Sequence, residues 1–288
     1  MILDAVSEGF NVKLGKYLER IGYRGEIGPT LDCLTAIHRC HAFAIPYENL
    51  DVQLGRPLDF DIERIFDKLV MRPRGGWCFE THILLEWALR EIGFDVMQVA
   101  AGIHRDERGD DLFGDHTAIL VRLDETYLAD LGLGDGIRDP IPLIEGTYSQ
   151  GALSFRLERL EDGYWRFHSH AFAYPNNFDF RDEPADWVRI GRQNQRLQTD
   201  PASIFVSNFV CQIMKPESVT CLTGRVLREK TVNGTTKQLI SKDEFEDILY
   251  RVFGIHDEEA SSIWPKVATR HEELFGEQKA EQIDFQGF

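Results

Sequence analysis

The chain has 288 residues, 43% of them hydrophobic, and a formal net charge of −16 from 32 Lys and Arg against 48 Asp and Glu. This is the composition of a folded protein with enough residues for a large buried core, and it argues against global disorder. Because so negative a chain repels phosphate backbones and anionic lipids, we expect neither a nucleic acid nor a membrane among its partners.

The chain shows no signature of export or membrane insertion. No apolar run reaches the length of a membrane span, and the first ten residues, MILDAVSEGF, lack the basic and apolar regions of a signal peptide. The five cysteines, an odd number, are Cys33, Cys40, Cys78, Cys211 and Cys221. Without an export signal they are expected to be reduced thiols, so we expect a cytoplasmic protein.

The first part of the chain, to about residue 92, has the three- and four-residue spacing of helices. One such stripe runs from Cys33 to Ala42, and a second runs from Ile62 to Leu69 behind Asp59 or Asp61 as a cap, with Pro73 ending it. A third helix is predicted to begin near Cys78 and to stop at Gly93.

From about residue 95 to 228 the hydrophobic period shortens towards two, which predicts strands. The predicted strands are 96–104, 116–123, 127–133, 153–160, 164–170 and 204–214, and His168 and His170 are expected at the surface. Asp162-Gly163 is a hairpin signal, and several short strands with such turns suggest a barrel or sandwich.

The last part of the chain mixes one strand pair with helices. Asn233-Gly234 predicts a hairpin leading into a strand at 235–240. Ser241 and Glu244 match a capping box for a helix that stops at Gly254, and a last helix is expected to start near Asp257.

The segment from Arg74 to Glu80, RGGWCFE, is the best candidate for a nucleophile. Two glycines permit a tight, positive-φ path into a helix whose first turn holds Cys78. Unpaired N–H groups and the positive end of the helix dipole favour an anion there, which predicts a lowered thiol pKa and a reactive thiolate. The same N–H groups could stabilise an oxyanion on an attacked carbonyl.

Two other interpretations of these cysteines are weaker. Cys78 could be a small buried hydrophobic residue, but packing alone does not require Gly75-Gly76. Cys78 with His82, and Cys40 with its neighbouring histidines, share helix faces without a second Cys or His pair at zinc spacing. We therefore expect no metal site.

His116 is the best candidate for the base that a cysteine nucleophile needs, with His82 as the second choice. His116 opens a predicted strand, and Asp130 stands within an apolar segment where an acid needs a partner. A two-residue turn at Asp124-Glu125 would set His116 opposite Leu133, so pairing with Asp130 would need a bulge or another strand.

These pieces, in their order along the chain, resemble the arylamine N-acetyltransferase family. The likeness covers most of the chain and rests on IPYENLD at 45–51, RGGWCFE at 74–80, His116 before its strand, LADLGLG at 128–134, and the segment from Asn194 to Phe205. Two positions depart from the family pattern: Thr81 stands where an asparagine is expected, and Leu133 stands where an aromatic residue is frequent.

The resemblance implies an α+β multidomain fold with a papain-like Cys-His-Asp core. Its parts would be a helical N-terminal domain (1–92) carrying the nucleophile, a β-barrel middle domain (93–205) carrying the histidine and aspartate, and an α/β C-terminal lid (206–288). It implies a catalytic triad of Cys78, His116 and Asp130. Gly132 and Gly134, which lack side chains, are the candidates for close approach of CoA.

The implied reaction is a ping-pong transfer. Cys78 takes the acetyl group from acetyl-CoA, and an arylamine, arylhydrazine or N-hydroxyarylamine then attacks the thioester. His116 would handle the protons, and Asp130 would orient it. The chain has no GxxxxGK[ST] phosphate loop, so scattered bases in a local positive patch would meet the CoA phosphates.

Three alternatives stay open at this point. The same triad could close an amide from a larger acyl thioester, or act as a transglutaminase-like or papain-like hydrolase, and a non-catalytic binding protein could keep the scaffold. The sequence leaves the oligomeric state and the physiological acceptor open.

Overall fold

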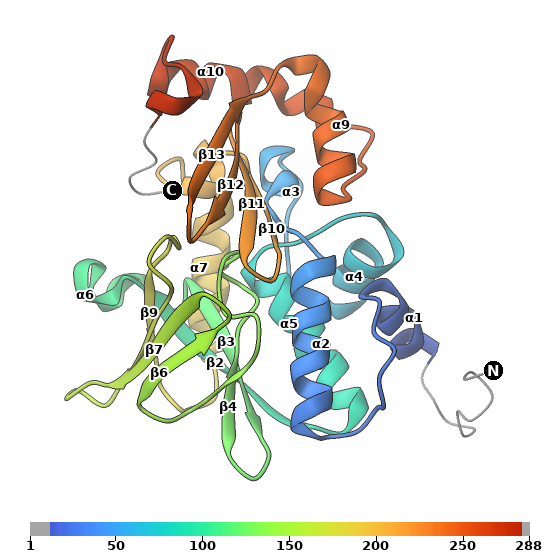
Figure 1. The fold of residues 1–288 in the computed structure, drawn as a ribbon, viewed down its shortest axis with the longest axis vertical. Helices are drawn as coiled ribbons and strands as arrows, with labels where there is room; N and C mark the ends of the chain where they lie inside the picture. The colour runs from blue at the N-terminus through green and yellow to red at the C-terminus, as the bar shows by residue number, and fades with distance from the viewer. Residues whose placement is uncertain (1–11, 284–288) are drawn as a thin grey trace.

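The computed structural model describes residues 12–283, so the N-terminal segment examined for a signal peptide lies outside the described residues. Helices, an eight-stranded sheet and a five-stranded sheet occupy different parts of the molecule (Figure 1). Among the described residues, no helix is long and apolar enough to cross a membrane.

The N-terminal part is helical, as the hydrophobic spacing predicts. Its helices are α1 (Val12–Arg20), α2 (Leu31–Ala44), α3 (Leu50–Gln53), α4 (Ile62–Phe66) with the π-helical turn η2 (Asp67–Met71), and α5 (Cys78–Ile92). Asp61 caps α4 by accepting from the backbone N–H groups of Glu63 and Arg64, and η2 ends just before Pro73. Gly93, at φ 103°, ends α5 as predicted.

An eight-stranded antiparallel sheet follows. Its strands lie in the order β5-β4-β3-β2-β9-β8-β7-β6. Their bounds are β2 (Asp95–Ile103), β3 (His116–Arg122), β4 (Thr126–Ala129), β5 (Ile141–Pro142), β6 (Gly146–Gln150), β7 (Leu153–Arg159), β8 (Trp165–His168) and β9 (Asn177–Phe180), with α6 (Arg105–Arg108) and η3 (Asp110–Leu112) between β2 and β3.

This sheet curls into a nearly closed barrel. Inward side chains such as Ala118, Leu120 and Phe167 fill it, whereas Ile119 and Val121 of β3 pack against the helices on the other side. At the open seam, Gln150 at the end of β6 accepts from the N–H groups of Arg138 and Asp139, just before β5. Strand β3 is therefore buried on both faces, which holds His116 rigidly.

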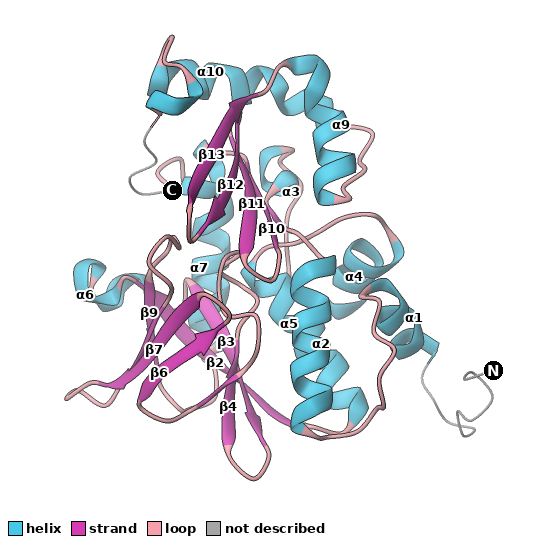
Figure 2. Cartoon of the chain, viewed as in Figure 1, coloured by secondary structure: helices cyan, strands magenta, loops and turns pink. Residues whose placement is uncertain are grey.

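The second sheet is five-stranded and antiparallel, in the order β1-β10-β11-β12-β13. It consists of β1 (Tyr47–Glu48), β10 (Val210–Met214), β11 (Ser218–Thr223), β12 (Val226–Thr231) and β13 (Gly234–Leu239). The remaining helices are α7 (Trp187–Thr199), α8 (Ile204–Ser207), α9 (Lys242–Phe253), η4 (Ala260–Ile263), α10 (Trp264–Phe275) and η5 (Ala280–Gln282). Figure 2 shows β10 to β13 with α9 and α10 above the barrel and the N-terminal helices.

Most predicted elements are present, and the exceptions have local causes. The hairpins at Gly163 and Gly234 and the capping box of Ser241 and Glu244 are confirmed. The predicted strand 204–214 is wrong in its first half, because Ser203 caps the short helix α8 through the N–H of Phe205. The last helix starts later than predicted, after η4.

His170 is not at the surface. It is 2% exposed, and its Nε2 lies 2.8 Å from Oδ1 of Asp135 in the loop after β4. His168, as expected, is partly exposed and pairs with Glu158. The prediction for His170 is wrong because β8 ends at His168, so the two histidines do not share one strand face.

Candidate active site

The backbone that leads to Cys78 is held like an extra edge strand. Tyr47 of β1 bridges to Gly76, with the N–H of Glu48 donating to the Gly76 carbonyl at 3.0 Å and the N–H of Gly76 donating to the Pro46 carbonyl at 3.2 Å. A Cβ on Gly75 would collide with the Pro46 carbonyl oxygen. Gly75 is needed for close approach of two backbones, whereas a Cβ on Gly76 would crowd the side chain of Glu80. Neither glycine has the positive φ that the sequence suggested.

Buried ion pairs support the same segment. Arg74 lies 2.8 Å from Glu48 and 2.6 Å from Asp257, which joins β1 to the C-terminal part of the chain. Lys68 lies 2.9 Å from Glu80 and 2.7 Å from Asp51. Glu80 in turn accepts from the N–H of Trp77 at 3.3 Å, so this network fixes the start of α5.

Cys78 is the first residue of α5, as predicted, and it is 3% exposed. The predicted lowering of its pKa is wrong for this arrangement. Burial raises the pKa of the Cys78 thiol well above its usual value, and the negative charge of Asp115 adds to this, while the backbone N–H of Phe79 acts in the other direction. The helix N-terminus does not by itself hold a thiolate here.

The side chains of His116 and Asp130 are in direct contact. Nε2 of His116 lies 3.0 Å from Oδ2 of Asp130, and both residues are almost fully buried. The contact and the neighbouring histidine hold the pKa of the Asp130 carboxyl well below its usual range despite burial. The pair needs no bulge, because the β3–β4 loop is one residue longer than a two-residue turn.

The register explains the meeting. Arg122 pairs with Thr126 and Ile119 with Ala129, where the pairing stops. Continuing it would set Gly132 opposite His116, which places Asp130 on the same face, two residues away. The pairing of β3 with β4 is shifted by one residue relative to the pairing that a two-residue turn would give. This shift puts the imidazole of His116 and the carboxylate of Asp130 on the same face of the sheet.

His82 lies on the same carboxylate. Its Nε2 is 3.0 Å from Oδ1 of Asp130, and its Nδ1 is 2.9 Å from Oγ1 of Thr117. The side chain is completely buried, and burial lowers the pKa of His82. His82 does not line the cleft described below, so the structure places it behind Asp130 rather than beside the substrate.

The two glycines singled out for CoA are held against the protein's own atoms. A Cβ on Gly132 would lie 2.6 Å from His82, 2.8 Å from His116 and 2.9 Å from Cys78. Gly134 has φ +71°, and a Cβ there would collide with Gln212. Gly132 lines the cleft, while Gly134 lines a separate cavity, so contact of either with CoA stays a prediction.

Cys78, His116 and Gly132 open onto one cleft with a volume of about 310 Å³. The barrel side of its wall comes from Ile103, His104, Arg108, Asp115 and Leu133. The opposite side comes from Tyr47, from α7 and α8, and from the second sheet: Arg196, Leu197, Ser203, Phe205, Gln212 and Thr223. A cleft of this size between two sheets can hold an aromatic ring or part of a CoA chain.

The two departures from the family pattern differ in position. Leu133 lines the cleft, so it contributes to the shape of the pocket. Thr81 turns away from it: its Oγ1 donates to the carbonyl of Cys78 at 3.0 Å and to that of Trp77 at 3.2 Å.

Charged cleft residues were missed by the sequence analysis. Asp115 accepts from the N–H of Ile103 and lies 2.9 Å from Nη1 of Arg108. Both come from the loop between β2 and β3, whose polar sequence is typical of a solvent-exposed connection. Arg196 comes from α7, a helix inside a region predicted to form strands, so no local signal placed it here.

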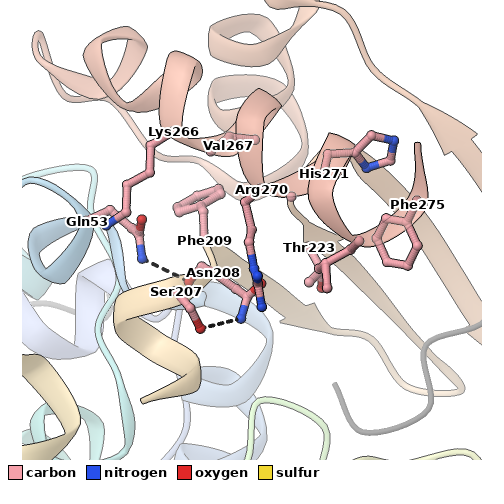
Figure 3. Close-up of a pocket in the computed structure, with 12 residues that line it drawn as sticks. Gln53, Ser207, Asn208, Phe209, Thr223, Lys266, Val267, Arg270, His271 and Phe275 are labelled. Atoms are coloured by element: carbon pink, nitrogen blue, oxygen red, sulfur yellow. Dashed lines mark hydrogen bonds between the residues drawn. The ribbon is translucent and has the colours of Figure 1, made fainter. Parts of the chain in front are cut away.

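A second cavity lies between α8, the end of β11 and α10, lined by Asn208, Phe209, Arg270 and His271 among others (Figure 3). Its volume of about 10 Å³ is that of a single water molecule, which excludes it as a substrate site. Among residues 12–283, no group of three or more His, Cys, Asp or Glu is placed to hold a metal ion.

Comparison with known proteins gives the family. The sequence model of an N-acetyltransferase family matches residues 30–261. The pineal gland isozyme of arylamine N-acetyltransferase from Gallus gallus is 31% identical over 272 residues, which cover 83% of this chain and 93% of that protein. The chain belongs to the arylamine N-acetyltransferase family. Arylamine N-acetyltransferase 1 of Homo sapiens is 30% identical over 90% of this chain and 97% of its own.

Solved structures of arylamine N-acetyltransferases share the fold. The enzyme from Mycobacterium abscessus superposes with a TM-score of 0.80 at 26% identity, covering 88% of this chain and 94% of that one. The enzyme from Mycobacterium marinum, solved in complex with CoA, gives 0.77 at 28% identity, covering 90% and 98%. The resemblance inferred from the sequence is confirmed, together with a mixed α/β fold and membership of an acyltransferase family.

Proposed function

We propose that this chain transfers the acetyl group of acetyl-CoA to the nitrogen of arylamines, arylhydrazines or N-hydroxyarylamines through a thioester on Cys78. The observation that carries the proposal is that Cys78, His116 and Gly132 line one cleft, with Asp130 directly behind His116. The CoA complex of the Mycobacterium marinum relative supports the donor.

In the first half-reaction, Cys78 attacks the acetyl carbonyl. Since Nε2 of His116 is engaged by Asp130, Nδ1 is the nitrogen left to take the thiol proton. The new bond joins Sγ to the carbonyl carbon, the bond to the CoA sulfur breaks, and CoA leaves with the proton from His116. Unpaired backbone N–H groups in the first turn of α5 would stabilise the oxyanion.

In the second half-reaction, the amine nitrogen attacks the thioester carbonyl. His116 accepts a proton from the nitrogen, the Sγ–C bond breaks, and the Cys78 thiol is restored while the amide leaves. Asp130 orients the imidazole and stabilises its cationic form in both halves.

The raised thiol pKa fits this division of work. Because burial favours the neutral thiol, the nucleophile forms when its proton moves to an adjacent imidazole, and the low-pKa carboxylate of Asp130 stabilises the resulting imidazolium. We propose that the three residues form a Cys-His-Asp core of the papain type, and that residues 206–288 act as the lid over it.

The five cysteines are all free in the structure, which fits the cytoplasmic location we expect. Cys33, Cys211 and Cys221 are buried, and no histidine within residues 12–283 is hydrogen-bonded to their thiols, so we assign them to packing.

Intact-protein mass spectrometry after incubation with acetyl-CoA tests the proposal. We expect the mass gain of one acetyl group, mapped by peptide analysis to Cys78 and discharged by an aromatic amine. Cys78→Ala should abolish the adduct with the fold intact, and Asp130→Asn should slow its formation by about 10³- to 10⁴-fold. Cys33→Ala serves as the matched control and should acetylate normally.

The same experiment separates the alternatives. A hydrolase would discharge the acetyl group to water as fast without the amine as with it. An enzyme for larger acyl thioesters would form its adduct faster with a longer acyl-CoA than with acetyl-CoA. An adduct on any residue other than Cys78 would contradict the proposed mechanism.

A further inference from the structure

Arg196 is a cleft cation that the chemistry of Cys78 does not use. It lies near the C-terminal end of α7, whose buried side, including Ile190, Asn194 and Leu197, fixes the helix against the molecule. Its Nε donates to Oε1 of Gln193 at 2.7 Å. Its Nη2 is buried and has no hydrogen-bond partner among the described residues.

The positive charge of Arg196 is not neutralised by the other charged groups of the cleft. Arg108 is engaged by Asp115 at 2.9 Å and by the Ile103 carbonyl at 3.3 Å, so that pair is neutral together. Across residues 12–283, Arg196 lies within ion-pair distance of no carboxylate; burial raises the pKa of the Asp115 carboxyl, and the charge of Arg196 is one of the smaller effects that oppose this rise.

Arg196 lines the cleft, and the planar fork of an arginine matches the oxygens of a phosphate or a carboxylate, so the cleft-facing part of this guanidinium can bind an anion that enters. The molecule as a whole carries a charge of −16, so a local cation also offsets the repulsion that an anionic substrate meets on approach.

We propose that Arg196 recognises an oxyanion of a substrate bound in this cleft, either a phosphate of the CoA thioester or a carboxylate on the aromatic acceptor. This inference rests on the proposed function and names a residue that selects its substrates. Arg196 is a binding residue here and takes no part in the proton transfers of His116.

Ping-pong kinetics can separate the two sources, because kcat/KM for the donor and for the acceptor report different half-reactions. The donors are acetyl-CoA and S-acetyl-N-acetylcysteamine, which lacks phosphate. The acceptors are 4-aminobenzoate and 4-methylaniline, which lacks the carboxylate. The variants are Arg196→Gln and Arg196→Lys, with Arg192→Gln as the matched control on the exposed side of the same helix.

We expect Arg196→Gln to lower kcat/KM for one anionic substrate by about tenfold or more, and to leave its uncharged counterpart within about twofold. Arg196→Lys should recover part of the loss, and Arg192→Gln should cause none. If kcat/KM falls for acetyl-CoA but not for S-acetyl-N-acetylcysteamine, Arg196 binds a phosphate of CoA. If it falls for 4-aminobenzoate but not for 4-methylaniline, Arg196 binds the carboxylate of the acceptor. Equal losses for all four substrates, or no loss, would overturn the proposal.

Failure of the proposed function is recognised separately. Wild-type protein that transfers no acetyl group from acetyl-CoA to 4-methylaniline contradicts the function itself. Calorimetric titration with CoA and with 4-aminobenzoate then decides about Arg196: weaker binding of one of them by Arg196→Gln supports anion recognition, and unchanged dissociation constants for both overturn it.

Discussion

At the residue scale, the site depends on one carboxylate with two histidines. Asp130 accepts from the N–H of Gly132 at 2.7 Å and lies 3.0 Å from both His82 and His116. Every oxygen of this buried acid therefore has a partner, which is what keeps it ionised. Gly132 closes the arrangement, because its bare Cα lets Cys78 and both imidazoles approach the same point.

Gly132→Ala tests that closeness. A Cβ at 2.6 to 2.9 Å from His82, His116 and Cys78 must push at least one of them aside. We expect kcat/KM for acetyl-CoA to fall at least about tenfold, and the free energy of unfolding to fall by about 1–3 kcal/mol. Steady-state kinetics and urea unfolding measure the two effects.

Gly136→Ala is the matched control in the same loop. The nearest atom to a Cβ there belongs to Leu133 at 3.6 Å, an ordinary contact. Its activity should stay within about twofold of wild type. Equal losses in both variants would mean that the loop, rather than the crowding at Gly132, is sensitive to side chains.

The sequence predicted which residues form the candidate site, but it did not predict their relative placement or the direction of the Cys78 pKa shift. Cys78 after two glycines, a histidine opening a strand and an acid in an apolar segment each carry a local signal, so the sequence alone is enough to propose all three. Their mutual placement depends on one extra residue in the β3–β4 loop, which sequence does not specify. The thiol pKa was missed because burial and Asp115 come from distant parts of the chain.

At the scale of elements, the start of α5 depends on charges from three segments. Lys68 of η2 holds Glu80 of α5 and Asp51 of α3, and all three side chains are largely buried. Burial alone would lower the pKa of the Lys68 ammonium, but the surrounding carboxylates raise it above its usual value. The ammonium is therefore charged and central to the network.

Removal of that charge should be costly. Lys68→Met leaves Glu80 and Asp51 without their shared partner in a buried site, so we expect a loss of about 3–5 kcal/mol in the free energy of unfolding. Lys215→Met, which removes one member of an exposed pair with Glu229, should cost no more than about 1 kcal/mol. Urea unfolding of both variants makes the comparison, and losses of similar size would show that the Lys68 network does not stabilise α5.

The ends of helices were predictable where the residue that ends or caps the helix lies within a few positions of that end in the sequence. Gly93 and Gly254 end helices at positive φ, and Glu244 caps the backbone of Ser241, all within a few residues. The helix α7 was missed because its apolar residues are few and a tertiary surface completes its buried side. The role of Gly75 was misjudged because its close neighbour, Pro46, lies far away in sequence.

At the scale of the molecule, a buried acid joins the two sheets. Asp135, in the loop after β4, lies 2.8 Å from His170 of the barrel side and 2.8 Å from Lys230 of β12. These partners hold the pKa of the Asp135 carboxyl well below its usual range despite burial. The barrel and the second sheet are thus coupled through a charge that acid would remove.

Acid should therefore destabilise the folded chain. The pKa of Asp51 is lowered to about 2, and those of Asp130 and Asp135 are lowered further. Their contribution is fully present above the unfolded value near 4 and is lost as the pH falls through the folded values. We expect the free energy of unfolding to fall steadily between about pH 4.5 and pH 2.5.

Asp51→Asn isolates one of these contributions. Glu80 and Asp115, whose pKa values burial raises, act in the opposite direction, so a single-residue comparison is needed. The variant should be less stable than wild type at pH 7, by on the order of 2 kcal/mol, and the difference should shrink towards pH 2.5. Urea unfolding across the pH range measures it, and a constant difference would contradict the assignment.

The dipeptide Tyr47–Glu48 pairs with β10 on one side and bridges to Gly76 on the other. The strand that steadies the nucleophile's approach thus takes its own support from residues more than 160 positions further along the chain. A fragment that stops before residue 206 would keep every group of the proposed core and yet lose the scaffold of its cysteine. We therefore expect the proposed core to reach its final geometry only once the C-terminal sheet has been made and has docked on β1.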